Sequence, residues 1–305
     1  MPISGPRLGE PPAASTIGGD ATEDMSWWRE LPGCVQDVYL YRELLFELTL
    51  RDLRIRYKQA VMGLLWAIVV PLVVVLAGAL FRYAWAGSAG QDVSQAELAG
   101  LAIKSLAWSF FVGAMSFATP SLTANLPLVT KVYFPRELLP LSAVLTQVVD
   151  SSIGVIALVI LLPATGVGSL AGLAWLPLIV TLLVALTLAA ALVSSSANVF
   201  FRDAKHVTQL ITGYGIFFTP VFYDVAAFGP RGVRLLMLNP FTPLLEGARL
   251  ALVAGHDLRA SLVNAQGALV WSPWFLAYSA AWAILGLVIS VVLFRRFEAD
   301  FAEYV

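Results

Sequence analysis

The chain has few of the side chains that enzymes use for catalysis. Its only cysteine is Cys34, and its two histidines, His206 and His256, have no cysteines or carboxylates around them at the spacing of a metal site. Metalloprotease and serine-hydrolase motifs do not occur. None of the four lysines follows a glycine, so the sequence has no P-loop for ATP. We expect no cofactor in this chain, so any energy input must come from elsewhere.

Charged side chains inside apolar segments are the stronger functional candidates. Asp150 lies near the middle of an apolar run and is flanked by Ser151 and Ser152. An intramembrane carboxylate is by default a functional candidate, and hydrogen bonding to those serines or to a neighbouring helix is the structural alternative. Glu246 and Arg249 are three residues apart and can pair on one helix face. We favour a structural ion pair there over a substrate contact.

Aromatic side chains are dense at the ends and in the interiors of the apolar runs. Most such residues form interfacial belts or pack between helices. A minority is predicted to line a pathway, where aromatic faces suit sugar rings because they offer apolar contact with polar edges. The candidates for this lining are Trp66, Trp108, Phe111, Phe117, Tyr214, Phe218 and Phe222.

The elements that must position these residues are membrane helices. The 305 residues are 59% hydrophobic and 13% charged, against about 25% charged in soluble domains. Their mean hydropathy is +0.79. Apolar runs of about the length that crosses roughly 30 Å of hydrocarbon predict six spans in an all-α integral membrane fold. The predicted spans are Val61 to Phe81, Ser105 to Ala124, Leu138 to Leu162, Leu173 to Ala197, Val207 to Phe222 and Trp274 to Phe294.

The distribution of Lys and Arg predicts the orientation of these spans. Alternate connections carry cations, whereas residues 163–172 between the third and fourth spans carry no charge. Arg82 and Lys104 are expected to snorkel at span ends on the other side. Both termini are therefore predicted to be cytoplasmic. The cations on that side are Arg51, Arg54, Arg56, Lys58, Lys131, Arg136, Arg202, Lys205, Arg295 and Arg296.

The segment before the first span divides into two parts. Residues 1–40 are predicted to be a disordered or loosely structured cytoplasmic tail. Residues 41–60 are predicted to form an amphipathic helix at the membrane surface, with a basic arc beside an apolar stripe. A soluble helix packed on a neighbouring domain is the alternative. The apolar stripe is Phe46, Leu50, Leu53 and Tyr57, and the headgroup candidates are Arg51, Arg54, Arg56 and Lys58.

Residues 125–140, between the second and third predicted spans, are predicted to be a cytoplasmic loop that contacts another protein. The loop combines charged and aromatic side chains with three prolines, Pro127, Pro135 and Pro140. Proline is well placed in the first turn of a helix. We therefore predict that Pro135 opens a short helix and that Pro140 opens the next element.

Residues 229–255 are predicted to form a re-entrant helical hairpin that dips in from the outer face before the last span. Two apolar stretches, 232–238 and 243–254, are separated by Asn239 and Pro240. Each is too short to cross a membrane and too apolar for a free loop. Two amphipathic helices lying on the outer surface are the alternative.

Five segments resemble the membrane subunit of ABC-type polysaccharide exporters, a family that exports O-antigen, teichoic acid and related lipid-linked glycans. The resemblance runs in order from about Glu43 to Phe294. The chain departs from the family pattern at Thr130-Lys131, where two basic residues are common, and at TGYG, residues 212–215. The segments are RDLRIRYKQAVMGLLWAIVVPL (51–72), VTKVYFPRELLPLS (129–142), NVFFRDAKHV (198–207), FFTPVFYD (217–224) and LNPFTPLLEGARLAL (238–252).

The resemblance implies a permease domain over residues 61–305, working as two permease subunits with two separate ATPase subunits, which would bind ATP and Mg. Phe134 would then be an apolar anchor on the ATPase and Arg136 a charged contact. The re-entrant segment would include Asn239, Pro240, Glu246 and Arg249. The full set of ATPase-coupling candidates is Lys131, Tyr133, Phe134, Pro135, Arg136, Glu137, Arg202 and Asp203.

The expected function is export of a lipid-linked polysaccharide across the bacterial inner membrane, with the ABC ATPase, a second permease copy and membrane lipids as partners and no nucleic acid. One alternative is a drug or small-lipid exporter of the same superfamily. A second is a membrane-bound glycosyltransferase, and a third is a proton-coupled carrier that uses Asp150. The sequence does not identify the glycan or its lipid carrier.

Overall fold

Five helices of the described chain are long and apolar enough to cross a membrane. The computed structural model describes residues 27–58, 65–90, 92–132, 134–164, 166–264, 269–298 and 301. At 1.5 Å per residue, each of these helices is longer than the roughly 30 Å of a hydrocarbon core. The five are α3 (Trp66–Ala89), α4 (Gln95–Ala118), α7 (Leu138–Ala164), α8 (Leu176–Phe200) and α12 (Pro273–Glu298).

The fifth predicted span corresponds to a shorter helix. Helix α9 (Ala204–Phe218) has 15 residues, about 22 Å of helix against a core of roughly 30 Å. The all-α membrane architecture is therefore confirmed by five long helices, and the count of six spans is not.

The second span begins earlier than predicted, at Gln95 instead of Ser105. Ser94 caps the helix, because its hydroxyl accepts a hydrogen bond of 3.2 Å from the Glu97 backbone N–H. The sequence Ser-Gln-Ala-Glu is the pattern of a capping box. The polar first turn lowers the local hydropathy, so hydropathy alone placed the start of this span too late in the sequence.

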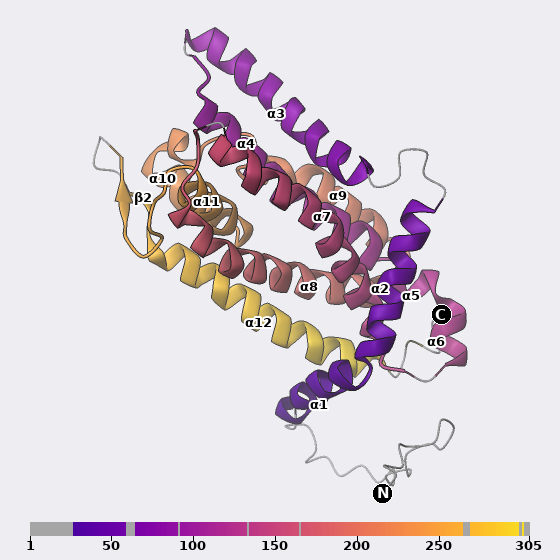
Figure 1. Ribbon diagram of the computed structural model, residues 1–305. Coiled ribbons are helices and arrows are strands. Elements are labelled where there is room, and N and C mark those ends of the chain that lie inside the picture. The colour runs from indigo at the N-terminus through magenta and orange to yellow at the C-terminus, as the bar shows by residue number, and fades with distance from the viewer. Residues whose placement is uncertain are drawn as a thin grey trace, which may run out of the picture.

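Figure 1 shows that the short elements gather at opposite ends of the bundle. Helices α2, α5 and α6 lie at one end, and α10, α11 and the strands lie at the other. The first group is α2 (Arg42–Tyr57), α5 (Ser121–Ala124) and α6 (Leu126–Lys131). The second group is η3 (Val225–Phe228), α10 (Gly229–Leu236), α11 (Phe241–Leu252) and the antiparallel pair β1 (Leu262–Val263) and β2 (Leu269–Trp271), with η2 (Ala171–Trp175) packed against α11.

The helices enclose two hydrophobic clusters. In the larger one, α4, α8 and α11 contribute most of the buried side chains. The smaller one lies at the α2 end and includes Leu45, Leu122 and Phe134 together with Phe294 and Phe301. Helix α8 packs along α12 and α4 packs along α7, whereas α3 contacts mainly α4 and α7 and lies at the edge of the bundle in Figure 1.

One prediction for the N-terminal segment needs correction. Residues 27–40 form a helix, α1 (Trp27–Leu40), which packs on α12. The predicted tail is therefore wrong for this part, and residues 1–26 lie outside the described residues. Helix α2 is present, and it packs on the protein through Leu45 and Leu48, whereas Phe46 of the stripe predicted to face the membrane is 61% exposed. The buried face also contains Thr49, because it packs against polar positions of α7.

The loop at 125–140 contains a short helix, but a different proline opens it. Pro127 stands in the first turn of α6. Pro135 precedes a turn that leads into α7 at Leu138, so the prediction that Pro135 opens the short helix is wrong. Pro140 lies in the first turn of α7. Tyr133 lies outside the described residues.

The predicted helical pair before the last span is present as α10 and α11. Pro230 lies in the first turn of α10, so that helix starts at Gly229, before the apolar stretch. Asn239 sets the turn between the helices, because its side chain accepts a 3.1 Å bond from the Phe241 N–H and donates a 2.9 Å bond to Thr219. Helix α11 is almost entirely buried against α4, α8 and α12.

Candidate functional site

The coupling candidates from the sequence divide into an exposed group and a buried group. Lys131, Arg202 and Asp203 are exposed. Phe134 and Glu137 are only 7% and 6% exposed. Phe134 belongs to the smaller hydrophobic cluster of the protein itself, so the structure contradicts its predicted role as an anchor presented to another protein. Pro135 is half-buried.

Arg136 and Glu137 fasten the turn before α7 to the end of α12. The Arg136 N–H donates a 3.1 Å bond to the Glu298 carboxylate, and its guanidinium donates to the Glu298 carbonyl. The Glu137 carboxylate pairs with Arg295 at 2.8 Å, and Arg295 also pairs with Asp37 of α1 at 2.5 Å. These pairs join the turn, α1 and α12. Arg136, which was predicted to contact an ATPase, therefore also makes contacts within the chain.

The single cysteine lies beside this cluster. Burial, and secondarily the negative charge of Glu137, raise the pKa of the Cys34 thiol to about 11. The thiol is therefore protonated at neutral pH, and the reactive thiolate is scarce.

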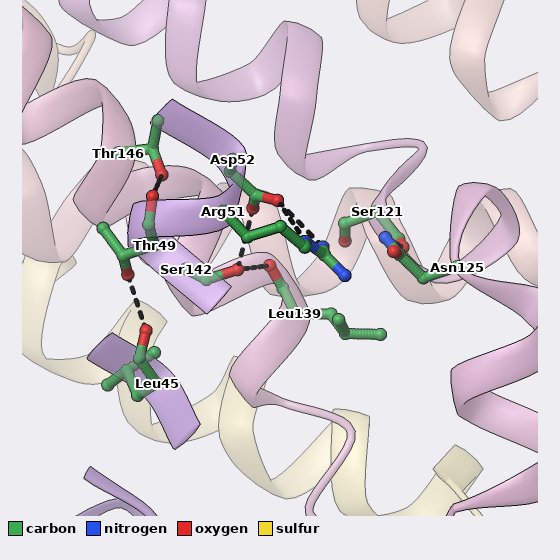
Figure 2. Close-up of polar contacts among 9 residues, drawn as sticks. All are labelled: Leu45, Thr49, Arg51, Asp52, Ser121, Asn125, Leu139, Ser142 and Thr146. Carbon is green, nitrogen blue, oxygen red and sulfur yellow. Dashed lines mark hydrogen bonds and ion pairs between the residues drawn. The ribbon is translucent and has the colours of Figure 1, made fainter. Parts of the chain in front are cut away.

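Hydrogen bonds between polar residues join α2 to α7 (Figure 2). The Ser142 hydroxyl donates to Asp52 at 3.3 Å, and the Thr146 hydroxyl donates to the Thr49 carbonyl at 3.4 Å. Arg51 turns toward Asp52 at 2.8 Å. Among the predicted headgroup residues, Arg54 and Lys58 remain exposed while Arg51 and Arg56 make contacts within the chain.

Arg56 reaches from the end of α2 to the middle of α7. Its Nη1 atom lies 2.6 Å from Asp150 and 2.9 Å from the Gln147 side-chain oxygen. The Tyr57 hydroxyl also donates to Asp150, and the Arg56 guanidinium stacks 3.9 Å over the Phe117 ring. Burial lowers the pKa of Arg56, and the carboxylate of Asp150 opposes this shift. Asp150 therefore bonds to a neighbouring helix and not to its flanking serines.

A cavity of about 480 Å³ opens beside this ion pair. It lies between the end of α2 and helices α3, α4, α7 and α9. Its charged residues are Arg56 and Asp150. The other polar or aromatic residues of its lining are Tyr57, Trp108, Ser109, Ser116, Phe117, Gln147, Ser151 and Thr212.

The predicted pathway aromatics occupy different environments. Trp108 and Phe117 line the cavity, whereas Phe111 packs against Trp108 and Phe241 in the core. Tyr214 and Phe218 project outward from α9, with exposed fractions of 63% and 74%. Phe222 lies at the far end, on the wall of a second cavity. The side chain of Trp66 lies outside the described part of the chain.

A second charge network connects the far-end helices to the bundle. The predicted pair between Glu246 and Arg249 is present, with 3.0 Å between Oε1 and Nε. Lys104 lies 3.7 Å from the other oxygen of Glu246 and donates a 2.8 Å bond to the Tyr223 carbonyl. Arg249 lies 3.7 Å from Asp224. This network surrounds a small cavity of about 100 Å³.

The snorkelling prediction is therefore wrong for Lys104. Lys104 is 3% exposed and lies within α4 because that helix begins earlier than predicted. Arg82 pairs with Glu97 at 2.7 Å, and both side chains are partly exposed. Sequence reasoning missed Lys104 and Asp224 as partners of α11, although the general rule that intramembrane charges have named partners pointed to Lys104.

These features are typical of a membrane transport protein. A bundle of membrane-crossing helices holds buried ion pairs and a partly polar cavity, and the described residues include no group of three or more His, Cys, Asp or Glu that could hold a metal ion. Buried charges in such helices are typical of transport proteins.

Comparison with known proteins identifies the family. Residues 43–253 match the ABC-2 type transporter family, and the chain belongs to it. The chain is 28% identical over 213 residues to the O-antigen export system permease protein RfbA of Myxococcus xanthus, covering 69% of this chain and 80% of that protein. Two Klebsiella pneumoniae proteins of the same name are 25% and 26% identical, each covering 68% of this chain and 78% of the relative.

Proposed function

We propose that this chain is the permease subunit of an ATP-driven exporter that moves a lipid-linked polysaccharide from the cytoplasmic to the outer side of the bacterial inner membrane. The observation that carries the proposal is its similarity to three O-antigen export permeases over more than two thirds of its length. The partly polar cavity among membrane-crossing helices supports it.

The proposed ATPase docks at the end of the bundle that carries α5 and α6. Two exposed segments at this end support docking, α6 with Lys131 and the connection 201–206 with Arg202 and Asp203. They lie near each other, since α5 contacts α8 and the Asn198 amide donates a 3.1 Å bond to Thr123. Both segments also present exposed apolar side chains, Val132 and Phe201. In this proposal Phe134, Arg136 and Glu137 lie beneath the docking surface and hold its backbone in place.

We also propose a second permease copy and a sixth crossing formed by α9 with its flanking residues. Helices α3 and α9 carry large exposed apolar side chains, and a partner copy or lipid would cover them. The burial of α11 supports a re-entrant pair, because non-helical backbone within a membrane must be enclosed by protein or line a wet cavity. With the α5–α6 end cytoplasmic, α10 and α11 lie toward the outer face (Figure 1).

Charge reversal on the docking surface is expected to separate the two subunits. The double variant Lys131→Glu, Arg202→Glu should weaken ATPase binding about tenfold, equivalent to about 1.4 kcal/mol, because both cations are exposed at the proposed interface. The measurement is the amount of ATPase that co-purifies with tagged permease from membranes. Arg231→Glu, an exposed reversal at the opposite end, is the matched control. Equal ATPase recovery in all three proteins would show that docking occurs elsewhere.

Deletion of the gene is the direct test of the substrate. We expect surface polysaccharide to disappear and its lipid-linked form to accumulate inside the cell, both reversed by a plasmid copy. The measurement is glycan staining of intact cells and of isolated inner membranes. A changed drug sensitivity with normal surface glycan would instead identify a drug exporter, and sugar transfer by the purified chain without any ATPase would identify an enzyme.

A further inference from the structure

The connection between α9 and α12 carries four arginines, and two of them have no acidic partner. Arg249 belongs to the charge network around Glu246, and Arg259 lies over the Trp175 ring at 5.6 Å. Arg231 and Arg234 of α10 are exposed, and the described residues offer neither of them an ion-pair partner. Helix α10 contains no acidic residue, and η3 and β2, which pack against it, contain no charged residue. The protein therefore leaves two positive charges on α10 without a counter-charge.

These arginines share one face of α10 with large apolar side chains. Arg231 and three of the other members follow each other at i, i+3, i+4 and i+7, the spacing of one side of a helix. The three apolar members are 56–68% exposed, whereas Val233 and Met237 on the opposite side are buried against the protein. The members of this α10 face are Phe228, Arg231, Arg234, Leu235 and Leu238.

Contacts with α12 place the α10 face at the edge of the membrane. The Leu238 carbonyl accepts a 2.8 Å bond from the Tyr278 hydroxyl. Tyr278 lies near the start of α12, one turn after Trp274, which is 80% exposed. Trp and Tyr near the ends of membrane helices are typical of the boundary between the hydrocarbon and water. The α10 face therefore lies at the level of lipid headgroups, at the end of the bundle opposite α5 and α6 (Figure 1).

The chemistry of the α10 face selects what covers it. Water alone would leave three large apolar side chains side by side in solvent. Hydrocarbon alone would surround two unpaired cations at a high cost. A second copy that met this face across a twofold axis would bring four arginines together. The boundary between anionic headgroups and acyl chains suits both kinds of side chain, because cations bond to phosphates there while apolar side chains reach the hydrocarbon.

We infer that the α10 face binds anionic phospholipids of the surrounding membrane. The phosphates pair with Arg231 and Arg234, and the upper parts of the acyl chains contact Phe228, Leu235 and Leu238. In the orientation proposed above, these lipids belong to the outer leaflet. The inference goes beyond the proposed export function and does not depend on which molecule the permease moves.

Quenching by brominated lipids tests the inference, because bromine quenches a fluorophore only at close range. Cys34→Ser removes the only cysteine, and bimane maleimide is then attached at Leu238→Cys on the α10 face. Leu285→Cys on α12 is the matched control, since Leu285 is 59% exposed and no charged residue lies within two helical turns of it along α12. The full-length chain is placed in phosphatidylcholine nanodiscs, in which the same minor fraction of lipid is either brominated phosphatidylcholine or brominated phosphatidylglycerol.

A cation near an anionic lipid surface contributes about fivefold to binding. Bimane at Leu238→Cys should therefore report a preference of about 25-fold for phosphatidylglycerol over phosphatidylcholine. The preference should fall to about fivefold in Arg231→Gln or Arg234→Gln and disappear in the double variant. Arg259→Gln, which removes an exposed arginine at the same end, should leave the preference unchanged. Bimane at Leu285→Cys should report no preference.

Three outcomes would overturn the inference. Equal quenching by both lipids at Leu238→Cys would show that the α10 face does not select anionic headgroups. Quenching by neither lipid would show that protein, such as a second copy, or water covers this face. An undiminished preference in the double glutamine variant would assign the selection to other groups. Equal quenching at Leu285→Cys with and without the arginines verifies that the variants keep their fold, and none of these outcomes bears on the export function, which the deletion strain tests.

Discussion

Replacing Glu246 with leucine is expected to lower the free energy of unfolding by about 3–5 kcal/mol, the usual result of leaving buried charges without their partner. Glu246 is fully buried between Lys104 at 3.7 Å and Arg249 at 3.0 Å. Its loss leaves Lys104, which is 3% exposed, without the carboxylate that lies 3.7 Å away. The measurement is thermal unfolding of purified variants in one detergent.

Glu97→Leu is the matched control. Glu97 also pairs with an arginine, at 2.7 Å from Arg82, but its side chain is 39% exposed. Pairs in such positions contribute about 0–1 kcal/mol, because solvent screens them. Glu246→Gln, which retains the shape and a hydrogen-bonding oxygen, should fall between the two. If Glu246→Leu and Glu97→Leu unfold at the same temperature, the network contributes no more than a surface pair.

The membrane helices were predictable because long apolar runs in the sequence directly indicate which segments lie in the hydrocarbon of the membrane. The starts and ends of the helices were harder to predict, since they depend on a few polar capping residues. Ser94 and Glu97 begin α4 within a stretch of low hydropathy, and this moved Lys104 from a span end into a helix interior. Helix α9 shows the opposite error. Its apolar run continues past Phe218, but the helix stops there, and Tyr223 folds back to donate a 2.9 Å bond to the Phe217 carbonyl.

Contacts within one helix were predictable from spacing, and contacts between distant segments were not. Glu246 and Arg249 pair because three residues of helix place them on one face. Nothing local connects Arg56 with Asp150 or Arg136 with Glu298, since each pair forms only when separate helices pack. Phe134 illustrates the same limit. Its sequence neighbours are those of an exposed loop, and its burial comes from Leu45 of α2 and Phe294 of α12, which lie far away in the sequence.

The family resemblance predicts which segments are functional, but it does not indicate the direction in which their side chains point. Residues 125–140 do form a short helix and a turn at one end of the bundle. However, three residues of the predicted contact set, Phe134, Arg136 and Glu137, make contacts within the chain, and the Glu137–Arg295 pair and the contact of Arg136 with Glu298 hold the turn against α12. A force applied to α6 would therefore reach α12, and through its packing α8, as well as α7.

The ion pair between Arg56 and Asp150 should behave as a coupled unit in a double-mutant cycle. Asp150→Asn leaves the guanidinium of Arg56, whose side chain is 14% exposed, without its carboxylate. Arg56→Gln leaves Asp150 with only the hydroxyl of Tyr57 among its present partners. Each single variant should lose about 2–3 kcal/mol, within the usual cost of truncating one partner of a buried charge-assisted hydrogen bond. The double variant should lose less than their sum by about 1–3 kcal/mol, the usual range for contacting residues.

Unfolding curves of the four proteins in one detergent give this coupling energy. A double variant whose loss equals the sum of the single losses would show that the two side chains are independent.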